Sequence, residues 1–71
     1  MTTRTIKADT VNHMYQLTLL EESGLLGNTQ YKIQVEKDGR EESVQVLETL
    51  DIALAVYEGL QTYYEKLAKD S

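Results

Sequence analysis

The chain has 71 residues and a formal net charge of −5, from 7 basic and 12 acidic side chains. It has no cysteine and a single histidine, His13, which excludes disulfides, zinc–thiolate sites and iron–sulfur clusters and argues against a His-rich metal site. This length holds one domain, residues 1–71, and a domain so short often needs an oligomeric partner when it has neither disulfides nor metals.

The acidic side chains are concentrated in the middle of the chain. Residues 21–58 contain nine acidic and three basic residues, and no cluster of Lys or Arg appears anywhere. Binding to a phosphate backbone depends on such clusters, so direct nucleic-acid binding is not expected. No run approaches the roughly 18 apolar residues of a membrane helix, so no membrane association is expected. The lack of cysteine and of an apolar segment after Arg4 fits a cytoplasmic protein.

The N-terminal half contains one clear strand pattern. Residues 2–8 favour extended chain and form either an extra edge strand or a loose arm. Residues 13–20 alternate, with Tyr15, Leu17 and Leu19 on one face, and this period of two predicts a half-buried strand.

The link from residue 21 to residue 29 is predicted to be a loop, because it contains two glycines and an asparagine. Leu25 and Leu26 lie in its middle. They either fold back over an edge of the core or stay exposed, in which case they would be a feature for interaction.

The next two segments, residues 30–37 and 40–47, are predicted to form a hairpin. They flank Asp38-Gly39, which suits a two-residue type I′ turn because both central residues need positive φ. Such a loop also sets the register, and the expected opposed pairs are Lys37–Arg40, Val35–Glu42, Ile33–Val44 and Tyr31–Val46. In this register Val44 and Val46 share a face with Tyr31 and Ile33.

The C-terminal segment is predicted to be one helix over residues 50–69. Thr49 is a good N-cap, and Asp51 suits the positive end of the helix dipole. The expected fold is therefore α+β: a three-stranded antiparallel β-meander, or a four-stranded one if residues 2–8 pair, packed on one long C-terminal α-helix.

The apolar surface of this helix is wider than one sheet covers. Ile52, Val56 and Tyr63 extend the apolar arc on one side, and Gly59 lies among them despite its cost of about 1 kcal/mol in a helix. A glycine here allows close approach of another backbone. The flank is expected to bind a partner. The alternatives are that the N-terminal segment or the Leu25-Leu26 loop covers it, or that it is simply exposed.

No catalytic pattern is present. His13 has no acid or nucleophile at a recognisable spacing, and no serine lies in a nucleophile elbow. The Gly24–Gly27 segment lacks the lysine of a phosphate-binding loop. The chain is therefore expected not to be an enzyme and to have no catalytic residue, cofactor or metal.

Two functional hypotheses follow. The first is a protein–protein interaction module, a homodimer formed through Ile52, Val56, Gly59 and Tyr63. The second is an acidic inhibitor or regulator, of the kind encoded by phages or plasmids. It would dock on a basic, nucleic-acid-binding site of a host protein through Glu36, Asp38, Glu41 and Glu42.

Overall fold

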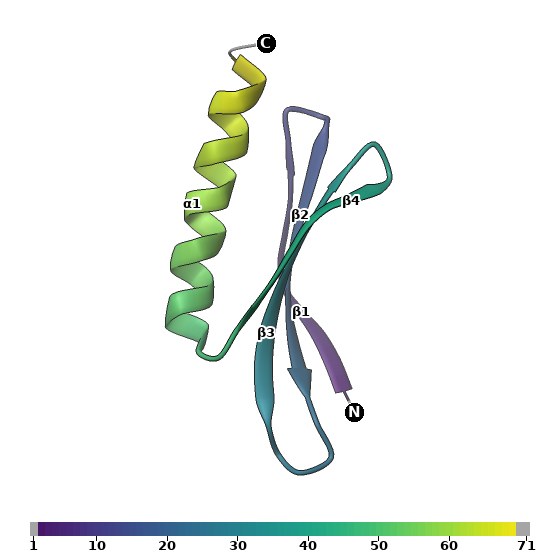
Figure 1. Cartoon of the computed structure of the whole chain (residues 1–71), viewed down its shortest axis with the longest axis vertical. Coiled ribbons are helices and arrows are strands. Elements are labelled where there is room, and N and C mark those ends of the chain that lie inside the picture. Colours follow the sequence, from purple (N-terminus) through teal and green to yellow (C-terminus); the bar gives the residue numbers. More distant parts are fainter. Residues whose placement is uncertain (1, 70–71) are drawn as a thin grey trace.

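A computed structural model describes the backbone of residues 2–69 and the side chains of residues 2–67. It has an α+β fold in which an open four-stranded antiparallel sheet packs against one C-terminal helix, as predicted (Figure 1). The strands follow the chain in the order β1-β2-β3-β4. The elements are β1 (Thr2–Val11), β2 (Tyr15–Ser23), β3 (Thr29–Lys37), β4 (Arg40–Leu47) and α1 (Leu50–Lys69).

The N-terminal segment is a full edge strand, which decides between the two alternatives left open by its sequence. β1 pairs antiparallel with β2 from Thr2, opposite Ser23, to Val11, opposite Tyr15. The register shifts at Ile6, which lies in a bulge between Thr5 and Lys7 and packs against the core. This bulge lets an apolar side chain turn inward from a strand whose other side chains are mostly exposed.

The turn between β1 and β2 contains His13, which the sequence analysis wrongly placed at the start of a strand. Asn12 and His13 both have positive φ, of 53° and 59°, and the amide of Met14 donates to the carbonyl of Val11 at 3.1 Å. Asn and His are among the few non-glycine residues enriched in this left-handed region. β2 therefore begins two residues later than predicted, at Tyr15.

The turn between β3 and β4 agrees with the prediction. Asp38 and Gly39 have φ of 53° and 80°, as a type I′ turn requires, and Lys37 lies opposite Arg40. The hairpin signal of Asp-Gly was therefore sufficient to locate the turn and both of its flanking residues.

The predicted register beyond this turn is wrong. Glu36 pairs with Glu41 and Val35 pairs with Ser43, so Glu42 is an extra residue in a bulge. The regular register would have placed the Glu42 carboxylate opposite Val35, which is fully buried. Burying a carboxylate there without a partner would be costly, and the bulge avoids it.

The bulge reverses the faces of the rest of β4. Val44 now pairs with Gln34 and Val46 with Lys32, so both valines lie on the face away from α1. Leu47, opposite Tyr31, takes the inward position instead and packs against the core.

The core lies between α1 and the middle of the sheet. The helix contacts β2 and β3 more than the two edge strands, and its first turn is capped by Thr49, whose Oγ1 accepts from the amide of Ile52 at 3.4 Å. Thr49 is thus the predicted N-cap. The buried residues are Val11, Tyr15, Leu17, Leu19, Ile33, Val35, Ala53, Tyr57 and Tyr64.

The molecule is elongated, with extents of 45 × 23 × 15 Å. The hairpin of β2 and β3 continues past the start of α1, so its tip projects beyond the layer that the helix covers (Figure 1).

Candidate partner-binding surfaces

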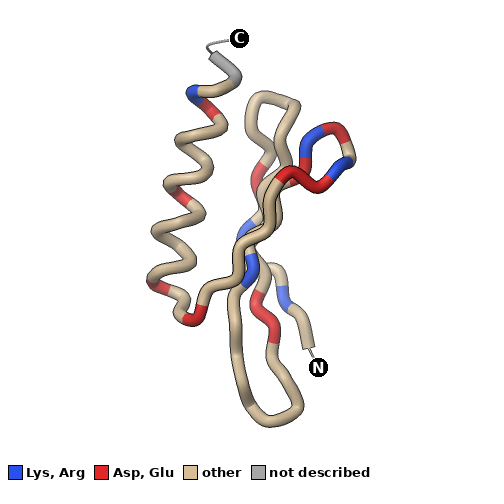
Figure 2. Tube along the Cα trace, viewed as in Figure 1, with Lys and Arg blue, Asp and Glu red and all other residues tan. Residues whose placement is uncertain are grey.

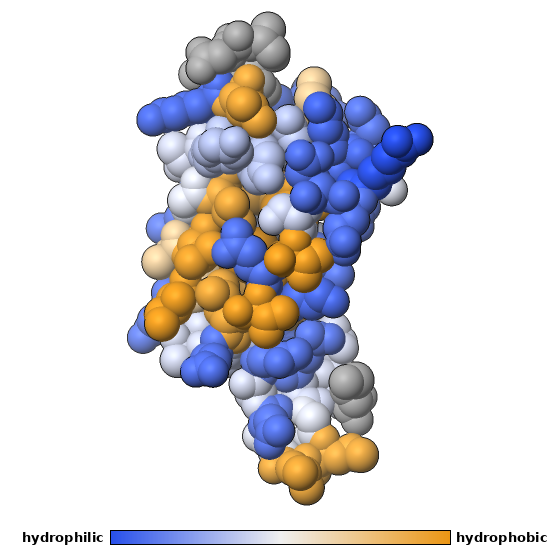
Figure 3. Space-filling model, in the orientation of Figure 1, coloured by the Kyte–Doolittle hydropathy of each residue, from blue (hydrophilic) through white to orange (hydrophobic). Residues whose placement is uncertain are grey.

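The first candidate surface is the row Ile52, Val56, Gly59 and Tyr63 on α1, called here the helix flank. Ile52 is 54% exposed and Tyr63 is 56% exposed, whereas Val56 is half-buried and packs against the core. Figure 3 shows hydrophobic side chains gathered over the first half of the helix and the adjoining strands. Neither β1, which lies in the sheet beside β2, nor the Leu25-Leu26 loop covers the two exposed side chains.

Two hydrogen bonds show which edge of the sheet the helix flank faces. The Tyr57 hydroxyl donates to Asp9 Oδ2 in β1 at 2.6 Å, and Asn12 Nδ2 donates to the carbonyl of Glu65 at 3.4 Å. The side of α1 that presents the Tyr57 hydroxyl and the Glu65 carbonyl therefore lies toward β1 and the β1–β2 turn. At 100° per residue, Ile52 and Val56 lie on the other side of the buried stripe, toward β4.

Gly59 is exposed, and a methyl group added at its Cα would meet nothing within 4 Å. Nothing in the folded chain therefore requires glycine at this helical position. Its backbone is accessible to a partner on the helix flank.

Tyr63 is held in place although it is exposed. Its ring meets that of Tyr64 edge to face, with centroids 5.0 Å apart and planes at 83°, and Tyr64 packs in turn on Tyr15 at 4.5 Å. Burial, with Glu42 and the neighbouring tyrosines, raises the pKa of the Tyr64 phenol. An exposed aromatic ring that is already ordered loses little conformational entropy when a partner covers it.

The second candidate surface, the acidic group at the β3–β4 hairpin, does not form one face. Glu36 and Glu41 are directly opposed, whereas Glu42 leaves the ladder at the bulge and lies near enough to Tyr64 to affect its pKa. Lys37 and Arg40 lie among the acids, so four acidic and two basic side chains give this hairpin a net charge of −2. Figure 2 shows both signs at its tip.

The tip of the β2–β3 hairpin carries the most exposed hydrophobic side chains. Leu25 is 92% exposed and Leu26 is 90% exposed, so the alternative in which they cover the core is wrong. The turn itself is ordered by two backbone hydrogen bonds, from Gly24 to the carbonyl of Asn28 and from Gly27 to that of Gly24. Gly27 has a φ of 82°, which favours glycine. The hydrogen bonds and backbone conformation of this turn therefore hold the two leucines away from the rest of the protein.

The Tyr57 hydroxyl is a hydrogen-bonded polar group within the core. Tyr57 is fully buried, its hydroxyl donates to Asp9, and the carbonyl of Leu17 lies 3.3 Å away as a second acceptor. Burial, followed by the hydrogen bond to Asp9, raises the pKa of Tyr57 far above its usual range. This group therefore stays protonated and joins α1 to the edge strand β1.

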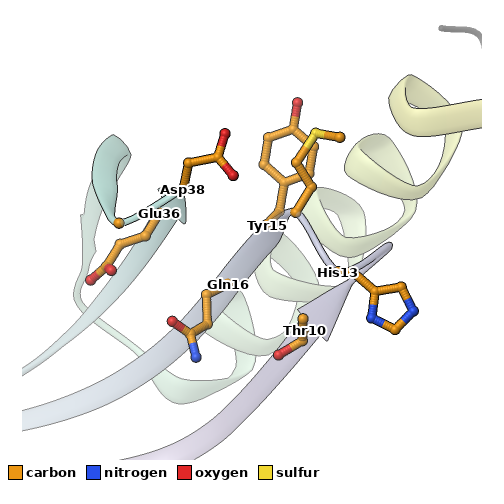
Figure 4. Close-up of a pocket in the computed structure, with 8 residues that line it drawn as sticks. Thr10, His13, Tyr15, Gln16, Glu36 and Asp38 are labelled. Carbon is orange, nitrogen blue, oxygen red and sulfur yellow. The ribbon is translucent and has the colours of Figure 1, made fainter.

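A shallow, mainly polar hollow lies between the two turns at one end of the sheet. Its lining includes His13, Tyr15, Glu36 and Asp38. In Figure 4 the imidazole of His13 points away from the carboxylates of Glu36 and Asp38. Among the described residues no hydrogen bond or ion pair joins them, so the hollow brings together no acid–base pair.

Residues 2–69 form neither a candidate metal cluster nor a membrane-spanning helix. No group of three or more His, Asp or Glu side chains in this range has an arrangement that could hold a metal ion. The helix in this range lacks the combination of length and hydrophobicity needed to cross a membrane.

One surface feature of β4 was not predicted from the sequence. Val44 is 37% exposed and Val46 is 56% exposed on β4, because the bulge turns them away from the core. The sequence did contain a signal for this bulge: in the regular register the Glu42 carboxylate would lie opposite Val35, on the sheet face that α1 covers.

Comparison with known proteins yields no match to a family model, a curated protein or a solved structure.

Proposed function

We propose that this protein is a small, non-enzymatic protein–protein interaction module of the cytoplasm that forms a homodimer through the helix flank. The observation that carries the proposal is the exposure of Ile52 and Tyr63, both more than half exposed on one side of α1. Covering such side chains removes apolar surface from water, which is the main favourable contribution to association.

A second copy is the partner best supported by the size of the chain. A domain of 71 residues buries a smaller fraction of its surface than a larger one, and it has no cysteine for a disulfide. A dimer contact would add apolar burial that the single chain lacks. A two-fold axis would bring the same flank from both copies together.

Sedimentation velocity at high micromolar concentration tests this proposal. The wild type should sediment as a dimer. Ile52→Glu should sediment as a monomer, because it places a charge in the proposed interface. The variant should still fold, because Ile52 is exposed and the core is not disturbed. Thr62→Glu is the matched control, since it adds the same charge at an exposed position on the polar side of α1, and it should remain dimeric. A monomeric wild type would contradict the proposal.

The alternative function is an acidic inhibitor or regulator, of phage or plasmid type, that docks on a basic site of another protein. It is supported by the opposed pair Glu36 and Glu41, which places two carboxylates side by side near Asp38. Binding of this kind should weaken steeply as salt is added, because salt screens the attraction. Charge-reversed Glu36→Lys/Glu41→Lys should bind less to a positively charged, anion-exchange-type surface. A retention that is indifferent to salt would count against this function.

A further inference from the structure

The two edges of the sheet differ in how they are protected against pairing with another strand. β1 carries a bulge at Ile6 and charged side chains at Arg4, Lys7 and Asp9, which are common devices that block an edge. The segment Ser43–Leu47 of β4 has no charge, no proline and no bulge. It presents unpaired backbone groups between two exposed valines.

We propose that Ser43–Leu47 pairs antiparallel with the same segment of a second copy, so that four strands from each copy form one continuous sheet. This inference rests on the proposed homodimer and specifies how its two copies meet. The helix flank and the β4 edge then belong to one interface, because the flank lies on the β4 side of α1.

The segment is self-complementary when the two-fold axis passes through Gln45. Val44 then lies opposite Val46 of the partner subunit. By symmetry, Val46 lies opposite Val44 of the partner subunit. Gln45 lies opposite its own copy, where each amide group can donate to and accept from the other. Directly opposed β-branched residues are favourable cross-strand pairs, so this register covers both exposed valines.

The area that a stable dimer needs also favours a contact larger than the helix flank. A specific interface buries about 800 Å² on each partner, and the whole surface of this protein is 5003 Å². The flank consists of four residues, of which one is glycine and one is already half-buried. The β4 edge adds its backbone to the contact, together with Val44 and Val46 on the sheet face opposite α1.

Antiparallel pairing places both helices on the same face of the shared sheet. Because α1 lies over β2 and β3, and strands are about 4.8 Å apart, each helix axis would be on the order of 10 Å from the seam. The two flanks therefore line a trough above the paired β4 strands. The two helix axes would be on the order of 20 Å apart, beyond the roughly 8–10 Å of packed helices. Ile52 and Tyr63 would project into this trough from both sides, and Gly59 would not be a point of close helix contact.

The charges next to the segment predict how this dimer responds to salt. Glu42 and Glu48 flank Ser43–Leu47, and the two-fold axis brings Glu42 near Glu48 of the partner subunit. Like charges repel, and salt screens the repulsion. Dimerisation should therefore strengthen as salt is added, which is opposite to the behaviour expected of docking on a basic protein.

Single-cysteine variants test the pairing, because the chain has no cysteine of its own. Under mild oxidation of the full chain, Gln45→Cys should form a covalent dimer, since residue 45 lies opposite its own copy. Ala8→Cys, at an exposed position on the other edge strand, is the matched control and should stay largely uncross-linked. In sedimentation, Val46→Lys should be monomeric while circular dichroism shows the fold intact, because Val46 is exposed.

The outcomes separate this inference from the proposed function. If the wild type is a dimer but Gln45→Cys cross-links no more than Ala8→Cys, or Val46→Lys remains dimeric, the edge pairing is wrong and the flank dimer stands. If the wild type is a monomer, the proposed homodimer fails and the edge pairing fails with it.

Discussion

At the scale of single residues, backbone conformation separates the roles of the glycines. Gly39 has a φ of 80° in the β3–β4 turn, a region that L side chains rarely adopt. Gly59 lies in the middle of α1, where glycine only adds flexibility and an added methyl group would meet nothing. The same residue type is therefore required at one position and costly at the other.

This contrast predicts that replacing glycine by alanine has opposite effects on the free energy of unfolding at the two positions. Gly59→Ala should raise the free energy of unfolding by about 1 kcal/mol, the difference between glycine and alanine in a helix. Gly39→Ala should lower it by about 1 kcal/mol or more, because alanine is strained at positive φ. Urea unfolding at low protein concentration measures both. Equal changes in the two variants would contradict this account of the glycines.

The hydroxyl of Tyr57 predicts a loss of stability at alkaline pH. Its pKa is raised in the folded protein, so the folded state keeps a proton that the unfolded chain loses above about pH 10. The contribution of this group is complete below that pH and is lost as the pH rises further.

The test compares the wild type with Tyr57→Phe in urea at pH 8 and at pH 10.5. At pH 8 the variant should be less stable by about 1–2 kcal/mol, because it loses the hydrogen bond to Asp9. Between the two pH values its stability should fall less than that of the wild type. Parallel pH dependence in the two proteins would show that Tyr57 does not carry this effect.

At the scale of elements, the β2–β3 hairpin combines a stable base with an apolar tip that the fold does not need. Leu17 and Leu19 are fully buried in β2, whereas Leu25 and Leu26 lie at the end of the same hairpin, almost fully exposed. Large exposed side chains of this kind contribute little to folding.

The double substitution Leu25→Ser/Leu26→Ser should therefore change the free energy of unfolding by less than about 0.5 kcal/mol. Leu19→Ser, which places a hydroxyl in the core, should cost several times more, on the order of 3 kcal/mol. Thermal or urea unfolding of both variants makes the comparison. A large loss in the tip variant would mean that the leucines pack against the chain in solution.

At the scale of the whole molecule, α1 covers the middle of the sheet and leaves the β4 side open. The sheet is one layer thick, and the single helix lies mainly over β2 and β3. Ile52, Tyr63, Val44 and Val46 remain exposed around that open side. Within residues 2–69 no element covers these side chains, and the proposed second copy would do so.

Local signals in the sequence were enough to determine the α+β fold, three of its strands and its helix, but they left open whether the N-terminal segment is a strand. The period of two in β2 and β3, the Asp38-Gly39 turn and the Thr49 cap depend on residues close together in the chain, and all three agree with the structure. The wide apolar arc of α1 likewise identified Ile52 and Tyr63, because helical periodicity places them without knowledge of their neighbours.

Only the tertiary structure decided which side chains of β4 face the core and where the exposed apolar surface lies. The register of β4 depends on what covers Val35, and the exposure of Leu25 and Leu26 depends on how far the hairpin extends past α1. A bulge of one residue reverses every later side chain of a strand. The alternation of Val44 and Val46 fitted the regular register, and only Glu42, opposite Val35, spoke against it. Contacts between distant segments therefore determined which apolar side chains of β4 are exposed at the edge where we propose that a second copy binds.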